Sequence, residues 1–326
     1  MGRDWQGKWA DENNIEFVPM ISQPWLIDPG TDEKLCYFEG FYSLTPVCTT
    51  QDVIDTLKNS VAARTVRPRY LLGFNEQYNN RPPIGRDISP GQAVHYWGKY
   101  VQPGAIAAGL ELVSPSSNQG DNAVIWLADF LKSCYDKRND EQNYCNIELI
   151  TKIAIHNYDC RESYWEETYN GENSLFYKLM GEQLGTYGDK LDWMDYLLAR
   201  PLWVTETNCY WEQFFEGVPH SDSKKQCLRI SGQLPDTHGV GSLSKMEISD
   251  NFERYAWWTT WYNQPKPNFL TYLDGGLTPV GKAYLNPGDS SVNCEYTGEK
   301  VMADTAELTG VARLGTCPTT GTKMAQ

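Results

Sequence analysis

The chain of 326 residues is 40% hydrophobic and 13% aromatic, which supplies a folded core and excludes an intrinsically disordered chain. Its 28 basic and 42 acidic residues give a net charge of −14, which disfavours nucleic acid and anionic membranes as partners. No apolar run reaches the roughly 18 residues that a membrane span requires, so we predict no membrane insertion.

Short runs rich in β-branched, aromatic and leucine residues predict strands along the chain. In order, they cover residues 15–21, 70–74, 110–114, 150–156, 202–205 and 255–259. From the second run onward, successive starts lie roughly 40 to 50 residues apart, which leaves room each time for a strand, a helix and a loop. This rhythm is typical of repeated βα units.

Helices are predicted in the gaps between these runs. Ser89 has the character of a capping residue, with Pro at the following position and Gln92 at the third, ahead of apolar residues at helical spacing up to residue 101. Residues 121–134 predict a second helix, with an apolar stripe made of Val124, Leu127, Ala128 and Leu131. Residues 250–253 are expected to close a third.

Polar residues at the ends of the predicted strands indicate the architecture. Near-continuous apolar strands alternating with helices imply a parallel sheet that is covered on both faces. Polar groups follow four of these strands, at residues 75–76, 114–116, 156–158 and 206–208. Reactive side chains at the carboxyl ends of several strands are typical of a (β/α)8 TIM barrel, so we predict an α/β fold of this kind.

Several kinds of chemistry have no support in the sequence. The nucleotide-binding pattern G-x-G-x-x-G and the nucleophile pattern G-x-S-x-G are absent, and the four His residues form no H-x-x-x-H pair. We therefore predict no metal site and no cofactor.

Two glutamates remain as the candidates for catalysis. Glu76 ends the segment LLGFNE at residues 71–76, and Glu206 ends WVTE at residues 203–206. They are distant in sequence, but the strands of one barrel bring their ends to a common pocket. Hydrolysis of a glycosidic bond needs such a pair, because one acid protonates the leaving oxygen while one carboxylate attacks the anomeric carbon or activates water. Alternatively, a strand-end Glu only caps a loop or binds an Arg.

An ordered set of segments resembles glycoside hydrolase family 128, a family of β-1,3-glucanases. The similarity covers roughly residues 15 to 285. Its segments are FVPM at 17–20, LLGFNE at 71–76, LVSP at 112–115, WLADF at 126–130, HNY at 156–158, WVTE at 203–206, ERYAW at 253–257 and LTPVGKAY at 277–284. The resemblance implies a (β/α)8 barrel of the retaining type, with β-1,3-glucan as substrate.

The resemblance also implies roles for individual residues. Glu76 matches the general acid/base and Glu206 the nucleophile, while Asn75 matches the Asn that holds a sugar hydroxyl next to the scissile bond. His156 and Tyr158 match substrate-binding positions of the family's His-Trp-Tyr run. A retaining pair of carboxyl groups should lie about 5 to 5.5 Å apart.

Two departures from the family pattern stand out. Gln77 follows Glu76 where the family usually has Pro, which we expect to loosen the loop. The family's first strand has no counterpart in residues 1–14, so we expect a barrel that is shortened or lacks this strand. Either another chain supplies the strand or the numbered chain omits it.

Aromatic rings are expected to line a sugar-binding groove, because pyranose rings present C–H faces to them. Trp25 follows the first predicted strand, and Trp257 lies in the last one. From these places we predict that both bind substrate, and family position supports Trp257. For any single Trp, packing in the core is an equally good explanation.

Nine cysteines without a C-x-x-C pair favour a disulfide-forming, secreted protein over a cytosolic protein with buried thiols, although the chain begins without a signal segment. Spacing suggests Cys134–Cys145 and Cys36–Cys48 as short-loop pairs. Cys294–Cys317 would staple the C-terminal tail, and Cys160–Cys209 could pair across the barrel top, leaving Cys227 odd. Sequence alone leaves this connectivity open.

The sequence thus predicts a barrel domain over residues 1–285 and a tail over residues 286–326 packed on it. The leading hypothesis is a secreted, retaining endo-β-1,3-glucanase that uses two glutamates in a double displacement. One alternative is a non-catalytic glycan-binding or structural protein of an extracellular or cell-wall assembly, on the same fold. Another is a related barrel hydrolase acting on a different polysaccharide.

Overall fold

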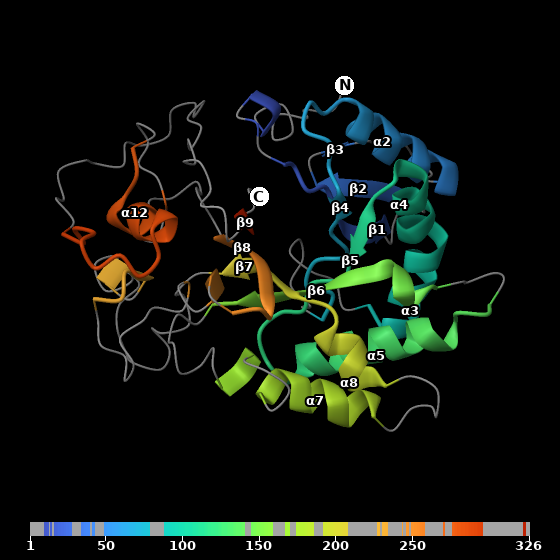
Figure 1. Cartoon of the computed structure of the whole chain (residues 1–326). Coiled ribbons are helices and arrows are strands. Elements are labelled where there is room, and N and C mark those ends of the chain that lie inside the picture. Colours follow the sequence, from blue (N-terminus) through green and yellow to red (C-terminus); the bar gives the residue numbers. More distant parts are fainter. Residues whose placement is uncertain are drawn as a thin grey trace. The chain divides into compact units, whose positions relative to one another are not determined.

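A computed structural model of the chain divides into two compact units (Figure 1). The first comprises Met1–His156, Phe176–Trp203 and Met324–Gln326, and the second Asn157–Leu175 and Val204–Lys323. The structure describes residues 10–12, 14, 16–27, 34–39, 41–42, 49–78, 88–140, 145–158, 167–169, 174–185, 192–207, 227–228, 230–233, 243, 246–247, 249–257, 270, 276–295 and 322–323. Of residues 22–27, 34–39, 41–42, 257 and 322–323, it describes only the backbone.

A parallel sheet organises the first unit. Strand β4 (Tyr70–Leu71) pairs in parallel with β5 (Glu111–Val113), and β5 pairs in parallel with β6 (Ile150–Asn157). The start of β7 (Leu202–Thr207) follows β6 in the sheet. Apolar side chains bury these strands on both faces, as helix-covered parallel strands require. The strands predicted over residues 110–114, 150–156 and 202–205 are confirmed.

Helices accompany this sheet in the first unit. They are α2 (Thr50–Ala62), α3 (Pro90–Tyr96), the π-helical turn η1 (Trp97–Val101), α4 (Gln102–Ala108), α5 (Asp121–Asp136), the 3₁₀ turn η2 (Ile147–Leu149), α7 (Leu175–Leu184) and α8 (Trp193–Leu198). In Figure 1, α5, α7 and α8 lie side by side, and Gln183 of α7 donates to Asp129 of α5 at 2.8 Å. The predicted Ser89–Gln92 capping box and the buried stripe of the helix over 121–134 are confirmed.

The segment that follows β4 is packed too tightly for any side chain at one position. A Cβ atom on Gly73 would lie 2.6 Å from Cζ3 of Trp97 and 2.8 Å from the backbone nitrogen of Pro115. Trp97 is fully buried and meets Phe74 and Phe130 edge to face. The chain leading to Glu76 is therefore fixed by its own core.

The predicted strand over residues 15–21 is only partly correct. Backbone hydrogen bonds join Ile21 to Leu72 and Leu72 to Pro19, which sets this segment beside the chain that follows β4. The strand β1 (Met20–Ile27) then continues into an antiparallel ladder with β2 (Lys34–Glu39), which pairs with β3 (Phe41–Tyr42). The period of the apolar residues could not reveal this antiparallel hairpin.

The second unit contains the rest of β7, then β8 (Phe252–Trp257) and β9 (Thr322–Lys323), with β8 and β9 parallel. Helix α12 (Pro279–Leu285) begins at the N-cap Thr278. The helix end predicted over residues 250–253 is wrong, because residues 250–251 form a turn and Phe252 and Glu253 already belong to β8. The last predicted strand starts three residues earlier than expected, at Phe252.

Two disulfides are present in the described part of the chain. Cys134–Cys145 confirms the predicted short-loop pair, which joins the last turns of α5 to the segment before η2. The predictions of a Cys294–Cys317 staple and of an odd Cys227 are wrong, because Cys227 pairs with Cys294. The predictions Cys36–Cys48 and Cys160–Cys209 lie outside the described side chains.

These elements confirm the α/β class with a parallel sheet. The closed (β/α)8 barrel stays a prediction, and the expected lack of a first strand falls largely on residues 1–9, outside the described part. Within the described residues, no helix has the length and hydropathy to cross a bilayer.

Candidate active site

The backbone around Glu76 is held by neighbours on both sides. Asn75 and Ser116 form an isolated parallel β-bridge. The backbone amide of Ser116 donates to the carbonyl of Phe74 at 2.8 Å, and the backbone amide of Glu76 donates to the carbonyl of Ser116 at 3.2 Å. Glu76 then has a φ of 46°, in the left-handed region that a residue with a Cβ rarely adopts. Because such conformations persist only where the surroundings enforce them, the position of Glu76 is closely determined.

Gln77 is anchored in the turn that follows Glu76. Its side chain is buried, and its amide nitrogen donates to the carbonyl oxygen of Asn75 at 2.8 Å. Its own carbonyl accepts from the amide of Ile88 at 3.4 Å. The expectation that Gln in place of the family's Pro loosens the loop stays a prediction, because residues 79–87 lie outside the described part.

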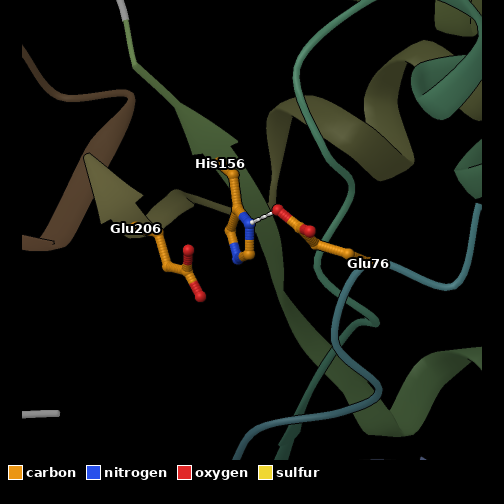
Figure 2. A group of neighbouring side chains, drawn as sticks. All are labelled: Glu76, His156 and Glu206. Atoms are coloured by element: carbon orange, nitrogen blue, oxygen red, sulfur yellow. Dashed lines mark hydrogen bonds and ion pairs between the residues drawn. The ribbon is translucent and has the colours of Figure 1, made fainter. Parts of the chain in front are cut away.

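A buried imidazole contacts the carboxyl group of Glu76. His156 comes from β6, where its backbone amide donates to the carbonyl of Ser117 at 2.8 Å. Its Nδ1 lies 2.8 Å from Oε1 of Glu76, and both side chains are almost completely buried. A dashed line in Figure 2 marks this contact. An imidazole nitrogen can donate to a carboxylate or accept from a carboxylic acid, so this contact serves both protonation states of Glu76.

The second unit carries the other carboxyl group. Glu206 lies in β7, whose residues are all buried, and is itself 7% exposed. The hydroxyl of Tyr158, in the residue that follows β6, donates to Oε2 of Glu206. The hydroxyl donates in this contact, and a carboxylate oxygen is a suitable acceptor for it.

Each predicted site residue can now be placed. Asn75 is half-buried directly before Glu76, His156 is bound to Glu76, and Tyr158 is bound to Glu206. Trp25 lies in β1 and Trp257 in β8, but their side chains are outside the described part. Direct contact of these five residues with substrate stays a prediction.

The sequence did not reveal the groups that hold Glu76. The carbonyl of Ser116 belongs to a strand-end segment whose polar character was visible, but main-chain acceptors carry no residue signal. The hydrogen bond from the Gln77 side chain to Asn75 depends on the left-handed φ of Glu76, which cannot be predicted from the residue types.

A family model matches most of the chain. The model described as the glycosyl hydrolase catalytic core matches residues 46–284, which is most of the chain.

The chain belongs to the glycosyl hydrolase catalytic core family. The matched range contains both Glu76 and Glu206, and it confirms the family resemblance that the ordered segments indicated. No curated protein sequence matches the chain significantly.

Three solved structures of glycoside hydrolase family 128 are similar to this catalytic core chain. An endo-β-1,3-glucanase of subgroup II from Sorangium cellulosum has 22% identity and a TM-score of 0.48, over 86% of this chain and 84% of that one. An exo-β-1,3-glucanase of subgroup VI from Aureobasidium namibiae has 14% identity and a TM-score of 0.47, over 85% and 80%. An oligosaccharide-binding protein of subgroup VII from Cryptococcus neoformans has 18% identity and a TM-score of 0.46, over 86% and 82%.

Proposed function

We propose that this glycosyl hydrolase family member is a retaining endo-β-1,3-glucanase with Glu76 as general acid/base and Glu206 as nucleophile. The observation that carries the proposal is the contrast between the partners of the two buried carboxyl groups. Glu76 contacts an imidazole, which fits a group that must gain and lose a proton. Glu206 receives a phenol hydrogen bond, which fits a group that must stay ionised to attack.

The proposal requires both carboxyl groups to reach one glycosidic bond. Glu76 follows β4, and Glu206 lies near the carboxyl end of β7; barrel active sites are built at this end of the strands. We propose that the full fold is a (β/α)8 barrel for this reason.

The reaction would run in two displacements. A carboxylate oxygen of Glu206 attacks the anomeric carbon while the bond to the glycosidic oxygen breaks, and that oxygen takes the proton of Glu76. In the second step, Glu76 accepts a proton from water as the water oxygen attacks the glycosyl ester and frees Glu206. Asn75, directly before Glu76, is suited to hold a sugar hydroxyl, and the neutral glucan needs no countercharge. No group from outside the chain is required for this scheme.

The choice of β-1,3-glucan rests on the resemblance to glycoside hydrolase family 128. Secretion rests on the cysteine usage, with which the two disulfides are compatible. The deciding experiment is incubation of the purified protein with laminarin, followed by reducing-sugar measurement and by NMR of the first product. Release of sugar with retained anomeric configuration supports the proposal. Binding of laminarin without release would favour the non-catalytic glycan-binding alternative. Release only from another polysaccharide would replace the substrate.

A further inference from the structure

One aromatic side chain at the turn of Glu76 is exposed. Tyr78 is 45% exposed, although it follows the buried Glu76 and Gln77 directly. The other large apolar side chains with comparable exposure in the described part are Ile106 on α4, Leu175 on α7 and Leu198 on α8. Single exposed apolar residues are common on helices, so exposure alone says little. Tyr78 differs from the others because it extends the loop at the carboxyl end of β4.

The backbone leading into Tyr78 is held in place. The amide of Glu76 is bound to Ser116, and the side chain of Gln77 is bound to Asn75. The carbonyl of Gln77, one residue before Tyr78, accepts from the amide of Ile88. A tyrosine on a fixed backbone has few torsions left to order, so it can offer a flat surface to a ligand at small entropic cost.

The proposed role of Glu76 indicates which part of the substrate lies near the Tyr78 ring. A general acid gives its proton to the oxygen of the departing sugar, so that sugar lies against the acid's own turn. The Cα atoms of residues two apart are separated by at most about 7 Å. Tyr78 is therefore within reach of the first sugars on the leaving-group side of the cleaved bond.

We propose that Tyr78 forms a sugar-binding platform on the leaving-group side of the cleaved bond. The ring packs against the C–H face of a glucosyl unit, and its hydroxyl at the rim can bond to a sugar hydroxyl. This inference rests on the proposed function, because the role of Glu76 as acid defines the leaving-group side. It makes Tyr78 a determinant of specificity that favours polymeric leaving groups.

The test compares Tyr78→Ala and Tyr78→Phe with Ile106→Ala as a matched control. Ile106 is similarly exposed, but α4 leads through Gly109 into the amino end of β5, at the edge of the sheet opposite the turn of Glu76. Two substrates are used: β-1,3-linked glucohexaose, with sugars on both sides of the cleaved bond, and an aryl β-laminaribioside, whose leaving group is a phenol.

For Tyr78→Ala, we expect kcat/KM on the hexaose to fall about tenfold, while kcat/KM on the aryl glycoside changes little. Tyr78→Phe should keep most of the activity, and Ile106→Ala should match the parent on both substrates. An equal effect of Tyr78→Ala on both substrates, or none on the hexaose, would overturn the platform and leave the hydrolase proposal standing.

If the parent protein hydrolyses neither substrate, the proposed function fails, and binding then decides only whether the Tyr78 ring is a sugar-binding platform, without reference to a leaving group. Isothermal titration with the same hexaose would then compare dissociation constants for the parent, Tyr78→Ala and Ile106→Ala. A weakening of about tenfold confined to Tyr78→Ala supports the platform. Equal dissociation constants, or no binding to the parent, overturn it.

Discussion

The two units hold their carboxyl groups by different means. In the first unit, Glu76 stands beyond the end of its strand, on a left-handed residue that neighbouring backbone groups secure, and it contacts an imidazole. In the second, Glu206 lies within the regular strand β7 and receives a hydrogen bond from a phenol. Under the proposed roles, the proton-transfer group has an imidazole partner at an irregular turn. The nucleophile has a position in a regular strand and a phenol that donates to it.

The largest effects should come from removing the carboxyl groups one at a time. Glu206→Gln removes the attacking oxygen, so hydrolysis of glucan and of aryl glycoside should both fall by about 10⁵-fold. Glu76→Gln should lower glucan hydrolysis by about 10²- to 10⁴-fold, and should affect an aryl glycoside far less because a phenolate leaves without a proton. Steady-state kinetics on both substrates measures the contrast.

The contrast breaks if the pattern is reversed. A Glu206→Gln variant that keeps activity on the aryl glycoside, or a Glu76→Gln variant that loses both substrates equally, would contradict the assigned roles. Circular dichroism of each variant serves as the control, because both side chains are buried and a misfolded variant would lose both activities.

The disulfides extend the comparison from the site to the stability of the units. By chain entropy, Cys227–Cys294 with a separation of 67 residues should contribute about 4 kcal/mol, and Cys134–Cys145 with 11 residues about 3 kcal/mol. We expect the double variant Cys227→Ala/Cys294→Ala to be less stable in urea unfolding than the double variant Cys134→Ala/Cys145→Ala. It should also weaken two hydrogen bonds near Cys294, from the amide of Gly288 to the carbonyl of Ile230 and from the side chain of Gln233 to the carbonyl of Val292.

If the two double variants lose equal amounts of unfolding free energy, local packing and not loop length sets the contribution of each disulfide. The control is the parent protein unfolded in urea with a reductant. Its loss of unfolding free energy should be at least as large as that of either double variant, because both disulfides are then reduced.

The disulfides also show what the sequence could and could not reveal. Cys134 and Cys145 were paired correctly because so short a loop leaves few other partners nearby. The partner of Cys227 cannot be predicted in this way, because spacing carries no information on contacts between segments 67 residues apart. Pairing over such distances depends on tertiary packing.

The same division holds for the fold and the site. The strands β5 and β6 were predicted because their apolar runs are short and uninterrupted, and the stripe of α5 was predicted from its period. The glutamates were found because strand ends can be located from those runs. The antiparallel ladder of β1 with β2 and the hydrogen bond from the Gln77 side chain to Asn75 could not be predicted, because both depend on pairings that no local sequence pattern encodes.

A smaller effect is expected from the partners of the two carboxyl groups. Tyr158→Phe removes one hydrogen bond to a charged group, so kcat/KM should fall about 10- to 100-fold, equally on glucan and aryl glycoside. His156→Ala should lower kcat/KM by a similar factor on glucan but by less on the aryl glycoside, because Glu76, the partner of His156, is proposed to protonate the leaving group.

Rescue distinguishes positioning from general damage to the core. His156→Asn keeps a polar group near Oε1 of Glu76 and should recover part of the glucan activity lost in His156→Ala. If His156→Ala loses both substrates alike, the imidazole supports the fold and not the acid, and the contrast between the two units disappears.

The smallest effect concerns the helix caps, where the two units differ again. Thr49 caps α2 in a reciprocal box with Asp52, and backbone and side-chain hydrogen bonds from Thr49 lower the pKa of that carboxyl below its usual value. Thr278 caps α12 by accepting from the amide of Gly281 at 2.9 Å, with no acidic residue in the first turn. At about pH 7, each Thr→Ala variant should lose about 1 kcal/mol of unfolding free energy.

The two caps should respond differently to acid. A carboxyl group whose pKa is lowered by folding contributes stability above its unfolded pKa of about 3.9, and loses that contribution as the pH falls through the folded value. The cost of Thr49→Ala should therefore shrink between about pH 7 and about pH 2, while that of Thr278→Ala stays constant. Urea unfolding at both pH values measures this, with Thr49→Ser and Thr278→Ser as controls that keep the hydroxyl. A cost of Thr49→Ala that does not change with pH would show that its hydroxyl caps α2 without help from Asp52, and the two caps would then be equivalent.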